Sequence, residues 1–176
     1  VVACSGVTDC YQPLERKLRL TRRCLEVFLE YRNPVAIVTK SGLIARDLDV
    51  LQALTTFSCV KALVSITTLD ANLAAIMEPR ASSPARRLGA IRRLAEAGVP
   101  VGVMVAPVIP ALTDHEMPAI LAAAKEVGAS CAGFVPLRLP FGLKELFTGW
   151  LAAHFPDRQE KVLNRVRELR VGKLYD

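Results

Sequence analysis

The stretch from Val60 to Pro110 combines two kinds of hydrophobic pattern. Two continuous apolar, β-branched runs flank a segment in which apolar residues recur at helical spacing, namely Leu88, Ile91, Leu94 and Ala95. The continuous runs predict buried strands, and the 3.6-residue spacing predicts a helix between them. A strand, a helix and a strand in this order form a crossover that makes the two strands parallel, and nearly all such units are right-handed.

Residues with special backbone properties mark both ends of this predicted helix. Ser83 can accept a hydrogen bond from a first-turn amide, and Pro84 stands where a missing N–H costs nothing. Gly98 supplies left-handed backbone that ends the helix before Pro100. The carboxyl ends of the two strands should therefore open on one side of the sheet, where parallel α/β folds bind ligands.

The same alternation of patterns extends over the rest of the chain. Further strands are predicted at 1–4, 35–39 and 131–137. Further helices are predicted at 21–31, from 47 onward, and at 113–128, 143–155 and 157–170. Thr113 and Glu116 have the spacing of a capping box at the start of one of these helices. Five strands that alternate with helices fit a doubly wound sheet or part of a β/α barrel, and periodicity alone does not separate the two.

Composition favours one domain with a covered sheet. The 176 residues are 52% hydrophobic with a mean hydropathy of +0.31, which suits strands buried on both faces. No apolar run approaches the ~18 residues of a membrane span, and no signal peptide is evident. We therefore expect a soluble, cytoplasmic protein that does not bind a membrane. The chain opens in strand-like sequence without an initiator Met, and we expect that an N-terminal piece is missing.

The cysteines and the net charge say less about function than the hydrophobic pattern says about the fold. The five cysteines show no metal-ligand spacing, so no metal site is predicted, and Cys24 and Cys59 are interpreted as small core residues of a protein in a reducing compartment. The net charge of +6 and the pI of 9.3 would suit an anionic partner. The arginines are spread over several predicted helices, so solvated helix faces are the favoured explanation, and a nucleic-acid surface is only permitted by them.

Candidate chemistry gathers where predicted strands end. Polar residues at these carboxyl ends are Cys4, Ser5, Thr8, Asp9, Lys40, Ser41, Ser65, Thr67, Thr68 and Arg138, and Glu78, Arg86 and Arg87 lie in or before the first turn of the central helix. Each could instead be a solvated turn residue or a packed strand residue. Because the set is rich in hydroxyls and cations and poor in carboxylates, it predicts a site for an anionic or zwitterionic ligand more than acid–base catalysis, and no catalytic residue is assigned.

Four runs carry a family resemblance: IVTKSGL, VSITTLD, MEPRASSPARRLGAI and AGVPVGVMVAPVIPALTD. In this order they resemble radical S-adenosylmethionine (SAM) proteins of the spore photoproduct lyase and DNA repair photolyase-like branch, over nearly the whole chain. The resemblance implies a partial (β/α)6 barrel in which strands two to six are present and the first strand and its cluster loop are missing. Residues 1–142 would form the partial barrel, and residues 143–176 would be C-terminal helices packed on the same domain.

The resemblance also implies the activity of the intact family member. A 4Fe-4S cluster, held by three cysteines in a CxxxCxxC loop, chelates SAM and cleaves it to a 5'-deoxyadenosyl radical that abstracts hydrogen from the substrate, and a nucleic acid is a candidate substrate. This chain lacks the cysteine triplet, so by itself it is expected to bind no cluster and to be inactive. Spore photoproduct lyase also uses a hydrogen-donor cysteine, whose position falls on Gly6 here with Cys4 nearby, which weakens the case for thymine-dimer repair.

Cofactor contacts are implied at seven positions of this chain. Thr8 and Lys40 resemble contacts to the methionyl part, and Ser65 resembles a polar contact to the ribose or the methionyl group. Arg87 resembles an arginine that pairs with the cofactor carboxylate, which suits its forked guanidinium. The remaining positions, which resemble the backbone edge and apolar floor beneath adenine, are Val105, Ala106 and Pro107.

Two other classes of function stay open. One is a non-catalytic, basic α/β module that contacts nucleic acid or protein through its helix arginines. The other is a cluster-free enzyme that holds a phosphorylated metabolite at Lys40 and Arg87. A fragment that lacks its first strand also has an unpaired sheet edge, so we expect self-association through that edge or poor solubility unless a partner covers it.

Overall fold

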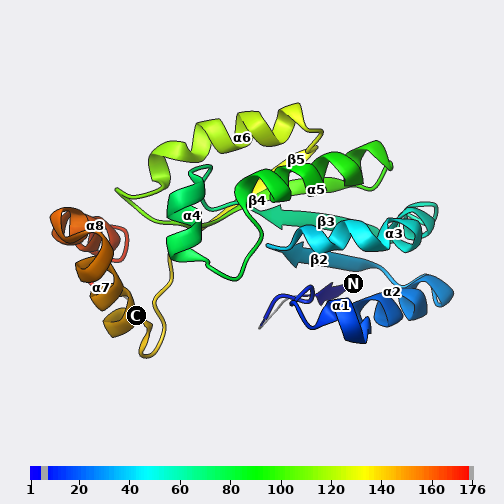
Figure 1. Cartoon of the computed structure of the whole chain (residues 1–176), viewed down its shortest axis with the longest axis horizontal. Helices are drawn as coiled ribbons and strands as arrows, with labels where there is room; N and C mark the ends of the chain where they lie inside the picture. Colours follow the sequence, from blue (N-terminus) through cyan, green and yellow to red (C-terminus); the bar gives the residue numbers. More distant parts are fainter. Residues whose placement is uncertain (5–7, 175–176) are drawn as a thin grey trace.

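The computed structural model, which describes residues 1–4 and 8–174, contains one parallel sheet in which the strands follow the order of the sequence (Figure 1). The strands are β1 (Val2–Cys4), β2 (Val35–Thr39), β3 (Val60–Ser65), β4 (Val101–Val108) and β5 (Cys131–Pro136). A doubly wound sheet reverses its strand order at a switch point, and this sheet does not. The α/β fold is therefore of the kind expected for part of a β/α barrel, and within the described residues the sheet stays open.

Helices cover the sheet and one end of it. They are α1 (Glu15–Leu18), α2 (Leu20–Glu30), α3 (Leu48–Thr55), α4 (Ala71–Met77), α5 (Pro84–Glu96), α6 (Met117–Glu126), α7 (Leu143–His154) and α8 (Pro156–Glu168), with 3-10 turns η1 (Gly42–Asp47) and η2 (Asp114–Glu116). Figure 1 shows α2, α3, α5 and α6 along the strands and α4, α7 and α8 toward the end at which the strand arrows point. Successive right-handed crossovers place helices on one face in this way. No described helix is long and apolar enough to cross a membrane.

The residues predicted to start and end the central helix do so in the structure. Ser83 Oγ accepts a hydrogen bond from the Arg86 amide, Pro84 is the first residue of α5, and Gly98 has a φ of 73° just after the helix. The predicted strands at 35–39 and 131–137 are also confirmed within one residue. The sequence did not predict α1 or α4, which are short helices in segments expected to be loops.

Alternate residues of the strands build the core. On β2, Val35 and Ile37 are buried while Ala36 and Val38 between them are partly exposed. The buried set pairs in register with Val60 and Ala62 of β3 and packs with the helices in one hydrophobic cluster. Each fully buried large aliphatic side chain contributes about 1.5–3 kcal/mol relative to an exposed one, so this face of the sheet and its helices stabilise each other.

A second, smaller cluster joins α7 and α8 to the segment after β4. Its buried members are Ile109, Leu112, Leu151, Val162 and Leu163. Ile109 and Leu112 come directly after β4, so the cluster brings α7 to the carboxyl end of the sheet. This packing makes α7 a wall of the candidate site described below.

Two sequence predictions are wrong in instructive ways. Thr113 and Glu116 do not form a capping box: Thr113 Oγ1 accepts from the Ile109 amide, and the Glu116 carboxylate accepts from the Thr68 hydroxyl and the Leu69 amide. Cys24 is exposed on α2, whereas Cys59 is buried as predicted. In both cases the helix was predicted correctly, but Glu116 binds residues that lie far away in the sequence, and Cys24 lies on the exposed side of α2.

Two edges of the sheet are unpaired within the described residues. β1 pairs with β2 and β5 with β4, and no further strand follows either. On the edge strand β5, Phe134 is 63% exposed. Exposed edges favour pairing with another chain. Self-association through such an edge stays a prediction.

A close approach of backbones at Gly102 gives a testable prediction. A Cβ at Gly102 would lie 2.5 Å from the carbonyl oxygen and from the sulfur of Cys131 on the neighbouring strand, whereas a Cβ at Gly89 of α5 would meet nothing within 4 Å. Gly102→Ala should lower the free energy of unfolding by about 1–3 kcal/mol because β4 and β5 must separate. Gly89→Ala should raise it by up to about 1 kcal/mol through helix propensity. Urea denaturation followed by circular dichroism measures both, and equal effects of the two changes would contradict the strand packing.

Candidate functional site

The carboxylate of Glu78 joins residues from four segments at the carboxyl end of the sheet. Its Oε1 accepts a hydrogen bond from Lys40 Nζ and one from Thr67 Oγ1 at 3.3 Å, and its Oε2 accepts one from Arg87 at 2.5 Å. Glu78 directly follows α4, Lys40 follows β2, Thr67 follows β3, and Arg87 lies in the first turns of α5. We call these four residues the Glu78 junction.

A second carboxylate, that of Asp9, fixes the position of the Lys40 backbone. Asp9 Oδ1 accepts from the Thr39 hydroxyl at 2.7 Å and from the Tyr11 amide at 2.8 Å, and Asp9 Oδ2 accepts from the Lys40 amide at 2.7 Å. The segment after β1 is thereby fixed to the end of β2. Because the backbone of Lys40 is held, its side chain leaves the strand end at a defined position and reaches Glu78.

The guanidinium of Arg87 is built into the protein interior. Arg87 is 2% exposed, and its Nε and one terminal nitrogen donate to the backbone carbonyls of Ser82 at 2.7 Å and Ser65 at 3.0 Å. Its other terminal nitrogen donates to Glu78. A buried guanidinium requires such partners, since an unpaired buried charge is costly. Arg87 therefore ties α5 to the end of β3 and holds the carboxylate that also binds Lys40.

The environment of Glu78 keeps it ionised. Burial by itself would raise the pKa of Glu78, but the charges of Lys40 and Arg87 and their hydrogen bonds outweigh burial and hold this pKa below the ordinary value of a glutamate. The side chain of Glu78 is 13% exposed and that of Lys40 is 34% exposed. The junction thus presents a carboxylate and an ammonium to solvent, with the Arg87 charge behind them.

The junction opens into a cleft of about 490 Å³, which we call the rim cleft. Lys40, Glu78 and Pro107 line it on the side of the sheet, and Phe147 and Trp150 line it from α7. The rings of Phe147 and Trp150 stack with centroids 5.9 Å apart. A cleft with apolar walls and a few convergent polar groups is typical of small-molecule sites.

The structure brings most of the predicted cofactor positions to this end of the sheet. Lys40, Ser65 and Arg87 meet through the Glu78 junction, and Pro107 lies in the rim cleft. The remaining three positions have other surroundings. The carbonyl of Ala106 lies 3.1 Å from the Thr67 hydroxyl oxygen and shares its one proton with Glu78. The side chain of Val105 packs in the main core, and Thr8 lines a different cleft, of which Lys40 also forms a wall.

The sequence did not predict the structural role of two acidic residues. Glu78 and Asp9 stood among the polar candidates, but neither was assigned a cofactor contact, although they organise the cations and hydroxyls around them. Phe147 and Trp150 were predicted only as part of an amphipathic helix. The available signal was their spacing of three residues, which places two rings on one helix face.

The cysteine prediction concerns the start of the chain. Gly6, at the position of the hydrogen-donor cysteine, and Ser5 lie outside the described residues. Cys4 is partly buried at the end of β1, and burial, with a smaller contribution from Cys24, raises the pKa of its thiol. A raised pKa makes a thiol less reactive as a nucleophile. Among the described residues no group of three or more His, Cys, Asp or Glu side chains could hold a metal ion.

Parallel strands in sequence order are consistent with an α/β protein of the partial-barrel class, and the ionic and apolar groups at their carboxyl ends form a candidate small-molecule site. Comparison with known families then specifies the class. The chain belongs to the radical SAM superfamily, whose family model matches residues 1–124. Members of this superfamily in general are enzymes that use SAM and a 4Fe-4S cluster.

Similar proteins are found in archaea, bacteria and a virus. The chain is 34% identical to uncharacterized protein MJ0683 of Methanocaldococcus jannaschii over 112 residues, which are 64% of this chain and 42% of that protein. It is 31% identical to uncharacterized protein Rv2578c of Mycobacterium tuberculosis over 170 residues, which are 96% of this chain and 49% of that protein. It is 37% identical to uncharacterized protein ORF301 of Acidianus two-tailed virus over 110 residues, which are 62% of this chain and 35% of that protein.

The matched region spans about half or less of the length of these curated relatives. No solved structure matches the chain. The activity, substrates and partners of a whole protein of this kind therefore belong to the proposals below.

The Glu78 junction predicts a specific loss of stability. Glu78→Gln should lower the free energy of unfolding by about 3 kcal/mol at neutral pH, because it leaves the buried Arg87 guanidinium without its counter-charge. Glu126→Gln, on the exposed face of α6, is the matched control and should change stability by less than about 0.5 kcal/mol. Urea denaturation measures both.

The stability difference between wild type and Glu78→Gln should also depend on pH. Since the pKa of Glu78 is lowered in the folded state, its stabilisation is present above the ordinary glutamate pKa and is lost as the pH falls through the folded-state value. The stability difference between wild type and Glu78→Gln should therefore shrink in acid. A difference that stays constant or grows as the pH falls would show that the junction is not ionic.

Proposed function

We propose that this chain is most of the barrel of a radical SAM enzyme that resembles the spore photoproduct lyase and DNA repair photolyase-like branch. The observation that supports it is the Glu78 junction, which sets opposite charges side by side at the strand ends, next to an apolar cleft. The four sequence runs that carry the resemblance include Lys40, Glu78, Arg87 and Pro107 of this site.

The residues present fit the methionyl end of SAM. That end is a zwitterion, so it needs one anionic and one cationic partner close together. Glu78 can accept from the cofactor ammonium, and Lys40 can donate to the cofactor carboxylate. Arg87 is buried against Glu78 and in this proposal acts through it, as a positioning residue rather than by direct contact with the carboxylate.

The rest of the cofactor has apolar requirements that the rim cleft meets. Adenine is flat and weakly polar, and Pro107 with the α7 rings offers an apolar surface beside the junction. Packing by α7 would also keep water from the strand ends. When bound with its cluster, SAM supplies a 5'-deoxyadenosyl radical for hydrogen abstraction.

The cluster itself does not fit the described residues, since they provide no group of three ligands. The proposal therefore gives this chain the task of binding and orienting SAM, and it assigns the cluster to cysteines that the chain does not contain. A nucleic acid remains the proposed substrate, as the resemblance implies, and a cytoplasmic location is proposed with it. Thymine-dimer repair is not proposed, because Gly6 stands at the position of the hydrogen-donor cysteine.

The competing hypothesis of a phosphorylated metabolite between Lys40 and Arg87 has less support. Such a ligand needs both cations to face it. The Arg87 side chain is 2% exposed and donates to two backbone carbonyls and to Glu78. A phosphate at this point would also meet the Glu78 carboxylate, which repels it.

Binding of SAM to this chain tests the proposal. In equilibrium dialysis with radiolabelled SAM, Lys40→Met should weaken binding about tenfold or more, because it removes a charged hydrogen bond to the cofactor carboxylate. Lys61→Met is the matched control: Lys61 is an exposed residue near the start of β3, outside both clefts, and its loss should change affinity by less than about twofold.

Circular dichroism of both variants separates loss of binding from loss of the fold. Binding that Lys40→Met reduces and Lys61→Met does not would support the proposed site. Absence of SAM binding by the folded wild-type chain, or equal loss in both variants, would contradict it.

A further inference from the structure

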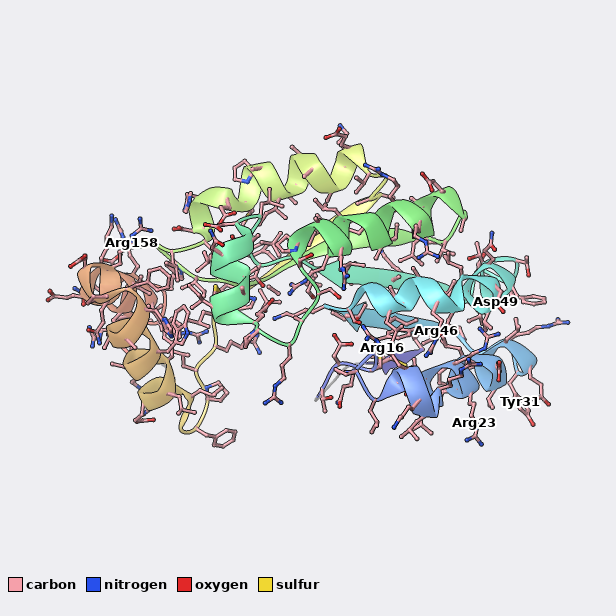
Figure 2. The ribbon with its side chains drawn as sticks, in the orientation of Figure 1. Arg16, Arg23, Tyr31, Arg46, Asp49 and Arg158 are labelled. Atoms are coloured by element: carbon pink, nitrogen blue, oxygen red, sulfur yellow. The ribbon has the colours of Figure 1, made fainter. Side chains whose placement is uncertain are left out.

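A second and larger cleft of about 890 Å³ lies between the segment around α1, the η1 turn and α5. Four arginines line it, namely Arg16, Arg80, Arg86 and Arg93. We call it the basic cleft. Figure 2 shows Arg16 and the neighbouring Arg46 in the space between α1 and the η1–α3 segment.

Among the described residues that line the basic cleft, one carboxylate faces four guanidiniums and an ammonium, so its charge is positive. The carboxylate that lines it belongs to Asp9, and its oxygens already accept from Thr39, Tyr11 and Lys40. Within residues 1–4 and 8–174, the side chains of Arg16, Arg80 and Arg86 donate no hydrogen bond and form no ion pair. Arg93 uses one nitrogen, which donates to the Ala45 carbonyl at 3.2 Å.

Two arginines near the basic cleft do have carboxylate partners. Arg22 pairs with Asp49 at 2.6 Å, and Arg46 pairs with the buried Asp47 at 2.8 Å. The Arg22 pair joins α2 to α3 and the Arg46 pair lies within η1, and both guanidiniums are occupied. The arginines of the basic cleft differ from these two in having no carboxylate partner among the described residues.

Two serine hydroxyl groups in the basic cleft can also donate hydrogen bonds to a ligand. Ser82 Oγ accepts from the Gly42 amide at 2.9 Å, and Ser41 Oγ accepts from the Leu43 amide at 3.3 Å. Each of these bonds fixes the oxygen and leaves its proton for another acceptor, and no such acceptor lies within the described part of the chain. Guanidinium forks and hydroxyl donors together match the several acceptor oxygens of a phosphate group.

One wall of the basic cleft leaves room for a ligand. Gly89 and Ala90 of α5 line it, and a Cβ at Gly89 would meet nothing within 4 Å. A ligand can therefore approach the helix backbone closely here, as it could not beside a large side chain.

From these observations we infer that the basic cleft binds a ligand through two or more phosphate groups. Several separated guanidiniums in a cleft of this volume exceed what one phosphate can contact. The rim cleft and the basic cleft share Lys40 among their lining residues, but the Glu78 junction lies on the rim cleft. The inference therefore does not rest on the proposed SAM site.

A charge introduced at Gly89 tests the inference without disturbing the Glu78 junction. Gly89→Glu places a carboxylate in the basic cleft at a position with room for the side chain. Gly149→Glu, on the exposed side of α7, is the matched control, because it changes a helical glycine with equal room and adds the same charge outside the basic cleft. The probes are inorganic pyrophosphate, measured by calorimetry, and a short fluorescein-labelled oligothymidylate, measured by anisotropy at fixed salt.

Wild type should bind at least one probe, and Gly89→Glu should weaken that binding about tenfold, while Gly149→Glu changes it by less than about twofold. Binding of pyrophosphate with this pattern would identify a free polyphosphate or nucleotide as the source of the phosphates. Binding of the oligonucleotide alone with this pattern would identify a phosphodiester chain. Failure of both probes to bind, or equal weakening by both variants, would overturn the inference, because net charge alone would then account for any binding.

Discussion

The Glu78 carboxylate is the constraint on which the candidate site depends. Lys40 lies 38 residues before it and Arg87 lies nine residues after it, and both donate to its two oxygens. Arg87 in turn holds the backbone of Ser65, so the ends of β2 and β3, the residue after α4 and the start of α5 are joined by one acidic group. A buried ionic group of this kind is tolerated because every charge in it has a partner, and removal of one partner would leave the others exposed to a large desolvation cost.

The parallel sheet makes this convergence possible. Because all strands run in one direction and follow sequence order, every strand ends at the same rim, and each following segment starts there. The rim divides into two clefts of different character. The rim cleft combines one ion pair with apolar walls from Pro107 and α7, whereas the basic cleft carries unpaired guanidiniums. In the proposals above the rim cleft binds a zwitterionic cofactor and the basic cleft binds a ligand with several phosphates. The two clefts therefore differ in the charge of the ligand that each would bind.

Much of the fold follows from local sequence, and most of the site does not. Ser83, Pro84 and Gly98 predicted the limits of α5 because capping and left-handed backbone are local properties. The order of strands was not predictable from periodicity, since strand neighbours are a long-range property. For the same reason Thr113 and Glu116 suggested a capping box, although Glu116 binds the segment after β3. Lys40, Ser65 and Arg87 were expected to meet, but the expected meeting point was a ligand, and the sequence gives no local sign that Glu78 occupies it.

The ionisation of Glu78 can be followed directly by NMR titration of its side-chain carboxyl carbon in the folded chain. The account predicts a midpoint below the ordinary range of glutamates, and a shift of that midpoint to higher pH in Lys40→Met, because one of the two compensating charges is lost. A midpoint in the ordinary range or above it, or one that Lys40→Met leaves unchanged, would show that burial prevails over the cations and that Glu78 does not organise the rim.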